Sequence, residues 1–143
     1  MVEKFAHMNV PPKFRDWAAM ARLPNVPTVW SNVFTAWIFA GGTLVDASRA
    51  GLWLSLLGGT LLYVGGTVLN DVSDVAFDQR HRAERPIPSG RIARGLAGAV
   101  AAALLLGGLA AFWLVHNYLA WLLLVLILLY TQAHKKLPAV GIV

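Results

Sequence analysis

Long runs of apolar residues alternate with short polar segments along most of this chain. The runs cover about residues 27–45, 52–69, 92–115 and 118–133. An α-helix needs about 17–25 apolar residues to cross the hydrocarbon core of a bilayer, and only the fourth run is short for that purpose. The pattern therefore predicts an all-α integral membrane protein with about four transmembrane helices.

The segment before the first run has a different, more polar composition. Pro11 and Pro12, in the middle of this segment, prevent one continuous helix. Aromatic and methionine side chains then recur at helical spacing between Lys13 and Ala21. We interpret residues 1–23 as a lead-in with a short helix at the membrane surface. Residues 24–143 are predicted to form a single membrane domain.

The basic residues lie almost entirely on one side of the predicted spans. The chain is 57% hydrophobic and 13% charged, whereas soluble domains carry about 25% charged residues. Eleven of the 12 Lys and Arg lie before the first span, between the second span and the first residues of the third, or after the fourth, and Arg49 alone lies on the other side. The positive-inside rule then predicts that both chain ends and the central loop are cytoplasmic, in a bacterial-type cell membrane. This distribution explains the net charge of +5 without a nucleic-acid partner.

The polar segment after the second run contains three aspartates. In one continuous helix, Asp71, Asp74 and Asp78 would share a face with Asn70. Carboxylates stacked at these spacings repel one another and require a counter-ion. Mg²⁺ suits them because it takes oxygen ligands and often shares one or two carboxylates with substrate phosphates. The alternative interpretation is an acidic turn neutralised by the neighbouring arginines.

This acidic segment continues into Arg-Pro-Ile-Pro-Ser-Gly at residues 85–90, and the combination resembles the UbiA superfamily of intramembrane prenyltransferases. The motif Asn-Asp-x-x-Asp-x-x-x-Asp at the end of a second span carries most of the resemblance. Residues 22–32 look like the family's approach to its first helix, and residues 130–136 are similar to the end of its fourth. The resemblance extends from about residue 20 to the end of the chain.

The resemblance implies a Mg²⁺-dependent enzyme that transfers a prenyl group within the lipid bilayer. The donor would be an isoprenyl diphosphate and the acceptor a small molecule, commonly an aromatic ring. Aromatic faces such as Tyr63 or Trp30 would stabilise the carbocation that forms when the diphosphate leaves. Carried over by position, the metal ligands are Asp71, Asp74 and Asp78, and the diphosphate ligands are Asn70, Arg22, Arg85, Tyr130 and Lys135. Asn32, inside the first span, fits substrate contact or hydrogen bonding between helices. No catalytic residue is assigned.

Two features depart from the family pattern. The family usually places a lysine four residues after the tyrosine of the fourth span, but here His134 takes that position and Lys135 follows it. The family also has about nine spans and a second Asp-rich motif on a later loop, and no such motif follows Asp78 in this sequence. We therefore expect the chain to be the N-terminal portion of such an enzyme and to be inactive alone.

Two other functions are compatible with the residues. A CDP-alcohol phosphotransferase also uses a carboxylate-rich membrane helix with Mg²⁺, but its motif begins Asp-Gly, whereas Asp71 precedes Val72 here. A non-enzymatic transport subunit would place its acids near the middle of the bilayer rather than at the end of a span.

Several other residues have structural explanations. Arg80 and Arg82 are interpreted as anchors at the membrane surface. The absence of cysteine excludes disulfides and thiolate nucleophiles. Glycines in the second and third spans allow helices to approach closely. They are Gly58, Gly59, Gly65, Gly66, Gly107 and Gly108.

Overall fold

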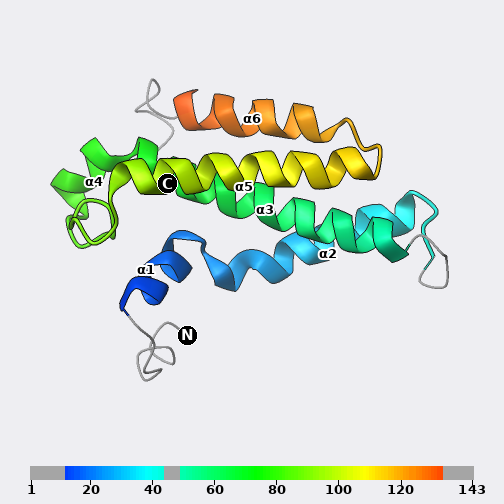
Figure 1. Ribbon diagram of the computed structural model, residues 1–143, viewed down its shortest axis with the longest axis horizontal. Coiled ribbons are helices and arrows are strands. Elements are labelled where there is room, and N and C mark those ends of the chain that lie inside the picture. Colours follow the sequence, from blue (N-terminus) through cyan, green and yellow to red (C-terminus); the bar gives the residue numbers. More distant parts are fainter. Residues whose placement is uncertain (1–11, 44–48, 134–143) are drawn as a thin grey trace.

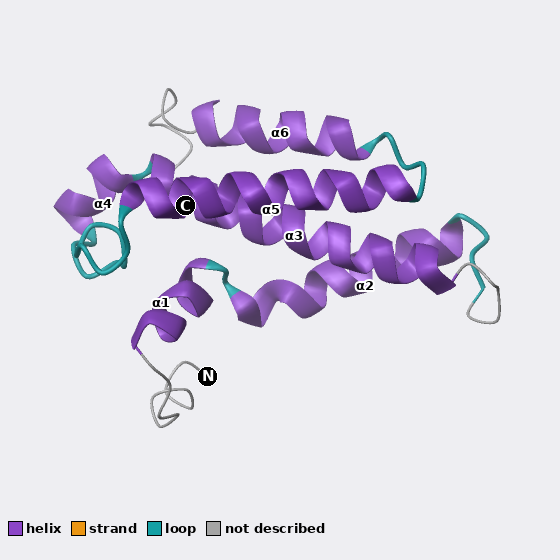
Figure 2. Cartoon of the chain, in the orientation of Figure 1, coloured by secondary structure: helices purple, strands orange, loops and turns teal. Residues whose placement is uncertain are grey.

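The computed structural model describes residues 12–43 and 49–133, and every regular element within those ranges is a helix (Figure 1, Figure 2). In chain order the elements are α1 (Pro12–Met20), the 3-10 helix η2 (Leu23–Asn25), α2 (Val26–Phe39), α3 (Arg49–Ser73), α4 (Val75–His81), α5 (Arg94–Leu114) and α6 (Ala120–Ala133). The predicted all-helical fold is therefore confirmed for the described residues. The short helix predicted in the lead-in is present as α1.

Helix α3 is the centre of the bundle and contacts α1, α2, α4, α5 and α6. Its most extensive contact is with α5, while α2 and α6 lie on opposite sides of this pair (Figure 1). Side chains on several faces of α3 are therefore in a position to line interhelical spaces.

Glycines allow the close contact between α3 and α5. A Cβ atom on Gly58 would lie 2.9 Å from the Phe112 ring and 3.2 Å from the carbonyl oxygen of Gly108. A Cβ atom on Gly108 would lie 2.8 Å from Leu62. Separations of 2.8 and 2.9 Å are too short for real Cβ atoms, so the two helices approach this closely because neither position has a side chain. The predicted packing role is confirmed at these two glycines.

Helix α2 ends earlier than the hydrophobic pattern predicts, because two glycines terminate it. Gly41 has a φ of +82° and donates its N–H to the carbonyl of Ile38 at 2.9 Å. Gly42 donates to the carbonyl of Trp37 at 3.0 Å, which completes a Schellman motif. The last two residues predicted for this span, 44 and 45, lie outside the described ranges.

Within the described ranges, two helices are long and apolar enough to cross a membrane, and they comprise Ala50–Ser73 and Arg94–Leu114. The apolar part of α6, Ala120–Gln132, is shorter. Most of its leucines are exposed, which is typical of a helix that contacts lipid or further protein. These helices support membrane association, and the count of four spans stays a prediction.

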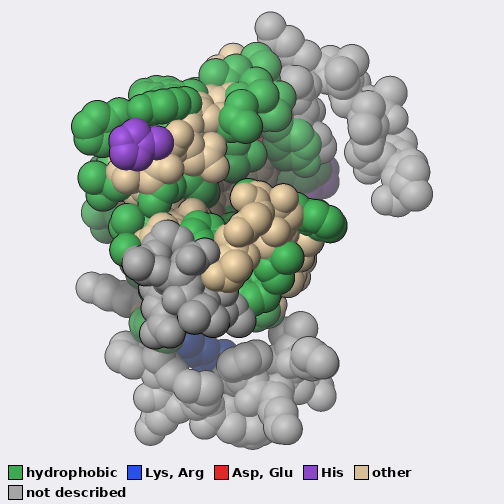
Figure 3. All heavy atoms as spheres, turned by 90° about the vertical axis from the view of Figure 1, so that its right-hand side faces the viewer, with side chains coloured by type: hydrophobic (Ala, Val, Ile, Leu, Met, Phe, Trp, Pro, Cys, Tyr) green, Lys and Arg blue, Asp and Glu red, His purple; other side chains and the backbone are tan. Residues whose placement is uncertain are grey.

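The charged side chains lie towards one end of the bundle. Among the described residues, all but Arg49 at the start of α3 lie in α1, at Arg22, or between Asp71 and Arg94. These segments include α1, α4 and the loop before α5, which Figure 1 shows on the left. Figure 3 looks at the opposite end, where the described side chains are mainly hydrophobic. The bundle therefore carries most of the charged residues of the described ranges at one end.

Candidate functional site

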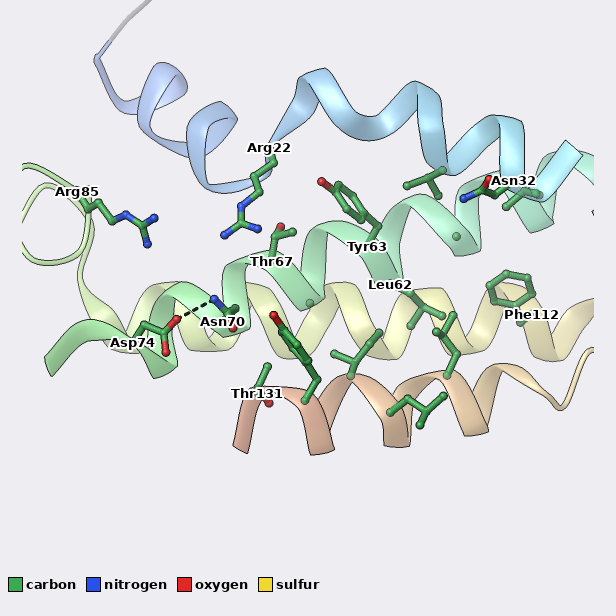
Figure 4. Close-up of a pocket in the computed structure, with 18 of the residues that line it drawn as sticks. Arg22, Asn32, Leu62, Tyr63, Thr67, Asn70, Asp74, Arg85, Phe112 and Thr131 are labelled. Carbon is green, nitrogen blue, oxygen red and sulfur yellow. Dashed lines mark hydrogen bonds between the residues drawn. The ribbon is translucent and has the colours of Figure 1, made fainter. Parts of the chain in front are cut away.

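A cavity of about 740 Å³ lies along one face of α3, between α2 and α6 (Figure 4). The residues of α3 that line it recur at intervals of three and four positions. They are Gly59, Leu62, Tyr63, Gly66, Thr67 and Asn70. At ~1.5 Å per residue, this lining face is about 16 Å long. The cavity is therefore elongated along a single helix.

The two ends of the cavity differ in polarity. Arg22, Arg85 and Asp74 lie towards one end, and Phe112 lies towards the other (Figure 4). Between α2 and α3, a Cβ atom on Gly59 would lie 3.0 Å from Val33, so aliphatic side chains border this part closely. A ligand that matches the cavity has a charged head and a long apolar body.

Asp74 and Asn70 form the acidic part of the cavity wall. The amide nitrogen of Asn70 donates a hydrogen bond to Asp74 Oδ2 at 2.8 Å (Figure 4). Helix α3 ends at Ser73 and α4 begins at Val75, so the acidic segment bends at Asp74. The prediction of one continuous helix face for the four motif residues is therefore wrong at this point.

The other two aspartates, Asp71 and Asp78, are not among the cavity-lining residues, and arginine side chains compensate their charge. Arg85 Nη1 lies 2.8 Å from Asp78 Oδ2 and 3.4 Å from Asp71 Oδ1. Arg22 Nη2 lies 3.7 Å from the same Asp71 oxygen. Within the described ranges, no three His, Cys, Asp or Glu side chains form a group that could hold a metal ion. Asp71 and Asp78 are thus paired with arginine in this structure, and the assignment of both with Asp74 as metal ligands stays a prediction.

Arg22 reaches the cavity from an unusual backbone conformation. It lies between α1 and η2 with φ 48° and ψ 46°, in the left-handed region. This conformation costs a residue other than glycine about 1–2 kcal/mol. Strain of this kind persists where the surrounding structure imposes it, often at ligand sites. The conformation accompanies a side chain that both lines the cavity and pairs with Asp71.

Most of the remaining predicted ligands also line the cavity. Asn32 does so from α2, and Tyr130 from α6. Lys135 lies outside the described residues. The structure thus brings together predicted ligands from segments about 100 residues apart in the sequence, as the family resemblance implied.

Some lining residues differ from what the sequence indicated. Arg82, interpreted as a surface anchor, lines the cavity, as do the buried hydroxyl residues Thr67 and Thr131. The position of Thr67, three residues before Asn70 on one helix face, was a signal for its location. Trp30 instead donates a hydrogen bond to Thr60 at 2.9 Å and thereby connects α2 to α3.

Known proteins share both sequence and fold with this chain. The UbiA prenyltransferase family matches residues 25–143. The digeranylgeranylglyceryl phosphate synthase of Methanoculleus marisnigri is 37% identical over 125 residues, which cover 85% of this chain and 43% of the relative. The enzyme of the same name from Methanoregula boonei is 34% identical over 130 residues, which cover 89% and 45%. The chain spans less than half the length of these relatives.

A solved structure supports the same relationship at the level of the fold. It is described as giving structural and mechanistic insights into digeranylgeranylglyceryl phosphate synthase in membranes. It matches this chain with a TM-score of 0.77 and 22% sequence identity, over 88% of this chain and 46% of that one. The match over residues 25–143 and the shared fold agree with the motif that first indicated the family. The chain belongs to the UbiA prenyltransferase family.

Proposed function

We propose that the protein transfers a geranylgeranyl group from geranylgeranyl diphosphate to a glyceryl phosphate acceptor in the membrane. The observation that carries this proposal is the elongated cavity, with charged side chains at one end and aliphatic side chains along its length. An isoprenyl diphosphate has the same division, because its diphosphate is charged and its tail is a hydrocarbon. Membership of a prenyltransferase family supports the choice of this ligand over other amphipathic lipids.

The acceptor follows from the names of the relatives. A digeranylgeranylglyceryl phosphate forms when a geranylgeranyl group is added to a hydroxyl of a glyceryl phosphate that already carries one such chain. The relatives of this name include chains 34–38% identical to this one. We therefore propose this lipid acceptor in place of the aromatic ring that the family resemblance implied.

Cationic side chains would hold the diphosphate at the charged end of the cavity. Arg22 and Arg85 approach that end from separate segments (Figure 4), and Arg82 is also among the cavity-lining residues. Guanidinium groups bind phosphate oxygens through charge-assisted and often bidentate hydrogen bonds. Tyr130 and Lys135 are further candidates for the same role, at and beyond the end of α6.

The oxygen donors at this end fit Mg²⁺. Asn70 and Asp74 are both on the cavity wall, and magnesium at phosphate sites is commonly bound by one or two carboxylates together with substrate phosphates. We propose that Asp74 and Asn70 hold the ion, while Asp71 and Asp78 keep Arg85 beside it. When bound, Mg²⁺ would neutralise negative charge on the diphosphate.

The proposed reaction breaks the bond between the allylic carbon of the donor and the diphosphate oxygen. The electron pair of that bond goes to the leaving diphosphate, where Arg22 and Arg85 would stabilise the charge. The Tyr63 ring, between the two ends of the cavity, would stabilise the allylic cation (Figure 4). The acceptor hydroxyl oxygen then bonds to this carbon and loses its proton to an oxygen of the departing diphosphate, while the apolar lining limits capture of the cation by water.

Binding and transfer assays of the natural protein in nanodiscs test this function. Asp74→Asn should weaken Mg²⁺-dependent binding of geranylgeranyl diphosphate by about tenfold or more, because it removes a charged ligand. Arg80→Gln is the matched control, since Arg80 is exposed and is not among the cavity-lining residues. Equal binding by Asp74→Asn and wild type would contradict the metal assignment. Transfer to an aromatic acceptor but not to geranylgeranylglyceryl phosphate would contradict the proposed acceptor.

A further inference from the structure

An ion pair outside the cavity connects two segments that are far apart in the sequence. Arg91 Nε donates a hydrogen bond to Asp16 Oδ1 at 2.9 Å, across 75 positions. The same guanidinium donates through Nη2 to the carbonyl oxygen of Glu84 at 2.8 Å. Arg91 therefore binds α1 and also joins the two ends of the loop 84–91. Neither Asp16 nor Arg91 is among the residues that line the cavity.

This pair differs from an ordinary surface salt bridge. Exposed pairs often contribute little, because solvent screens them and both side chains lose freedom. The Asp16 side chain, however, is only 12% exposed, and Arg91 makes two directional contacts at once. A partly desolvated carboxylate with a short hydrogen bond restrains geometry more strongly than a solvated one.

On the α1 side of the ion pair, Asp16 is close in sequence to Arg22, one of the two arginines at the charged end of the cavity. Asp16 is six residues before Arg22, which has left-handed backbone angles. Between them, Met20 is buried in the same apolar cluster as Ile87 of the loop and Ile92, which directly follows the loop. Apolar packing holds α1 against the loop without fixing its rotation, whereas the ion pair supplies a directional contact.

On the loop side of the ion pair, Arg91 belongs to the same loop as Arg85, the other arginine at the charged end of the cavity. The carbonyl oxygen of Arg85 accepts hydrogen bonds from the backbone N–H of Ser89 at 3.0 Å and from its hydroxyl at 2.7 Å. The Arg85 side chain then approaches Asp71, and Arg22 approaches the same carboxylate from the opposite segment. Arg22 and Arg85 thus approach the same Asp71 oxygen from two separate segments. The Asp16–Arg91 ion pair connects those two segments.

We propose that Asp16 and Arg91 are positioning residues for the diphosphate site. They fix α1 against the loop 84–91 so that Arg22 and Arg85 face the same end of the cavity. This role rests on the proposed function, because it concerns how the two arginines hold a diphosphate. Displacing a binding group by about 1 Å can cost a large factor in a preorganised site, so loss of the pair is expected to act without any contact to the ligand.

Calorimetric titration of the natural protein in nanodiscs with inorganic diphosphate and Mg²⁺ provides the first test. Asp16→Asn and Arg91→Gln should each lower the affinity by about tenfold, and the double variant should lose little more than either single variant, because both remove the same contact. The matched control is Arg15→Gln, which removes a charge from the exposed face of the same helix and should change the affinity by less than about twofold. In the transfer assay, the single variants should raise KM for the donor more than they lower kcat.

Distances measured by spin labelling provide a second test that does not depend on ligand binding. The chain has no native cysteine, so labels can be placed at the exposed positions Phe14 and Glu84. Asp16→Asn should broaden the distance distribution between α1 and the loop, and Arg15→Gln should leave it narrow. An unchanged distribution in Asp16→Asn would overturn the positioning role even if the wild type bound diphosphate. Broadened distances with wild-type diphosphate affinity would also overturn it, whereas a wild type without affinity for diphosphate would overturn the proposed function and this role together.

Discussion

Arg85 Nη1 donates a hydrogen bond to Asp78 Oδ2 at 2.8 Å, and the Asp78 side chain is only 2% exposed. Arg85 also lines the cavity, so one side chain both neutralises a buried carboxylate and faces the ligand space. Removing one partner of a buried ion pair typically costs about 3–5 kcal/mol, because the remaining charge is left without compensation. The Arg85 side chain is 27% exposed, so we expect a loss of stability below that range.

Stability measurements should show that Arg85 and Asp78 depend on each other. Arg85→Gln is expected to lower the free energy of unfolding by about 1–3 kcal/mol, because the buried Asp78 carboxylate loses its strongest donor. Asp78→Asn in the same chain should restore part of that loss. A double-mutant cycle by thermal unfolding in detergent measures the coupling. Strictly additive losses would show that the two side chains are energetically independent.

The close contact of α3 with α5 should tolerate no side chain at Gly58. Gly58→Ala places a methyl group 2.9 Å from the Phe112 ring and should destabilise the bundle by about 1–3 kcal/mol. Gly95→Ala is the matched control, since a Cβ there meets no atom within 4 Å and alanine favours the helix by up to about 1 kcal/mol. Opposite shifts in melting temperature are expected. A neutral Gly58→Ala variant would contradict the packing role of this glycine.

Narrowing the cavity at Gly59 should separate the binding of the prenyl tail from the binding of the diphosphate. Gly59→Val places branched carbon atoms where even a Cβ lies 3.0 Å from Val33, so the space between α2 and α3 shrinks. The affinity for geranylgeranyl diphosphate should fall by about tenfold or more, since the tail loses apolar contact. Inorganic diphosphate should bind as in the wild type, because the charged end is about 16 Å away along α3.

A matched control for this narrowing is Gly107→Ala, whose added methyl group makes an ordinary 3.4 Å contact with Leu61. It should leave the binding of both ligands unchanged. If Gly59→Val weakened both ligands equally, the cavity would not be divided between head and tail as proposed.

The predicted orientation in the membrane can be tested with single cysteines. Gln79 lies in the exposed part of α4, and Ala50 lies near the start of α3 at the other end. If the Asp-rich segment is cytoplasmic, an impermeant thiol reagent should label Ala50→Cys in intact cells, and Gln79→Cys only after permeabilisation. The opposite pattern of labelling would reverse the orientation and the side from which the diphosphate enters.

The helices were predictable because hydrophobic periodicity is a local property of the sequence. The ends of the helices were less predictable. Helix α2 ends at Phe39 because Gly41 adopts a left-handed conformation that terminates the helix, inside a run that is mainly apolar. The stop was visible in the sequence as a glycine pair but was outweighed by hydropathy.

The sequence identified the residues of the site, but it did not show which of them face the cavity and which pair with arginine. The motif identified Asn70, Asp71, Asp74 and Asp78, yet the bend at Asp74 determines which of them face the cavity. The ion pair between Asp78 and Arg85 also depends on the path of the loop, which spacing along one helix does not reveal. Long-range contacts of this kind follow from tertiary packing alone.

The glycine contact at Gly58 and Gly108 has a consequence for how the protein accommodates ligands of different width. Two backbones in direct contact cannot move closer and lose much of their packing if they separate, so α3 and α5 behave as one stiff unit. Helices α2 and α6 contact α3 less extensively. If the cavity widens when a ligand enters, α2 and α6 must therefore move relative to the α3–α5 pair, which stays in place. Substitutions in α2 and α6 should therefore change the width of ligand that the cavity accepts, without any change in the packing of α3 against α5.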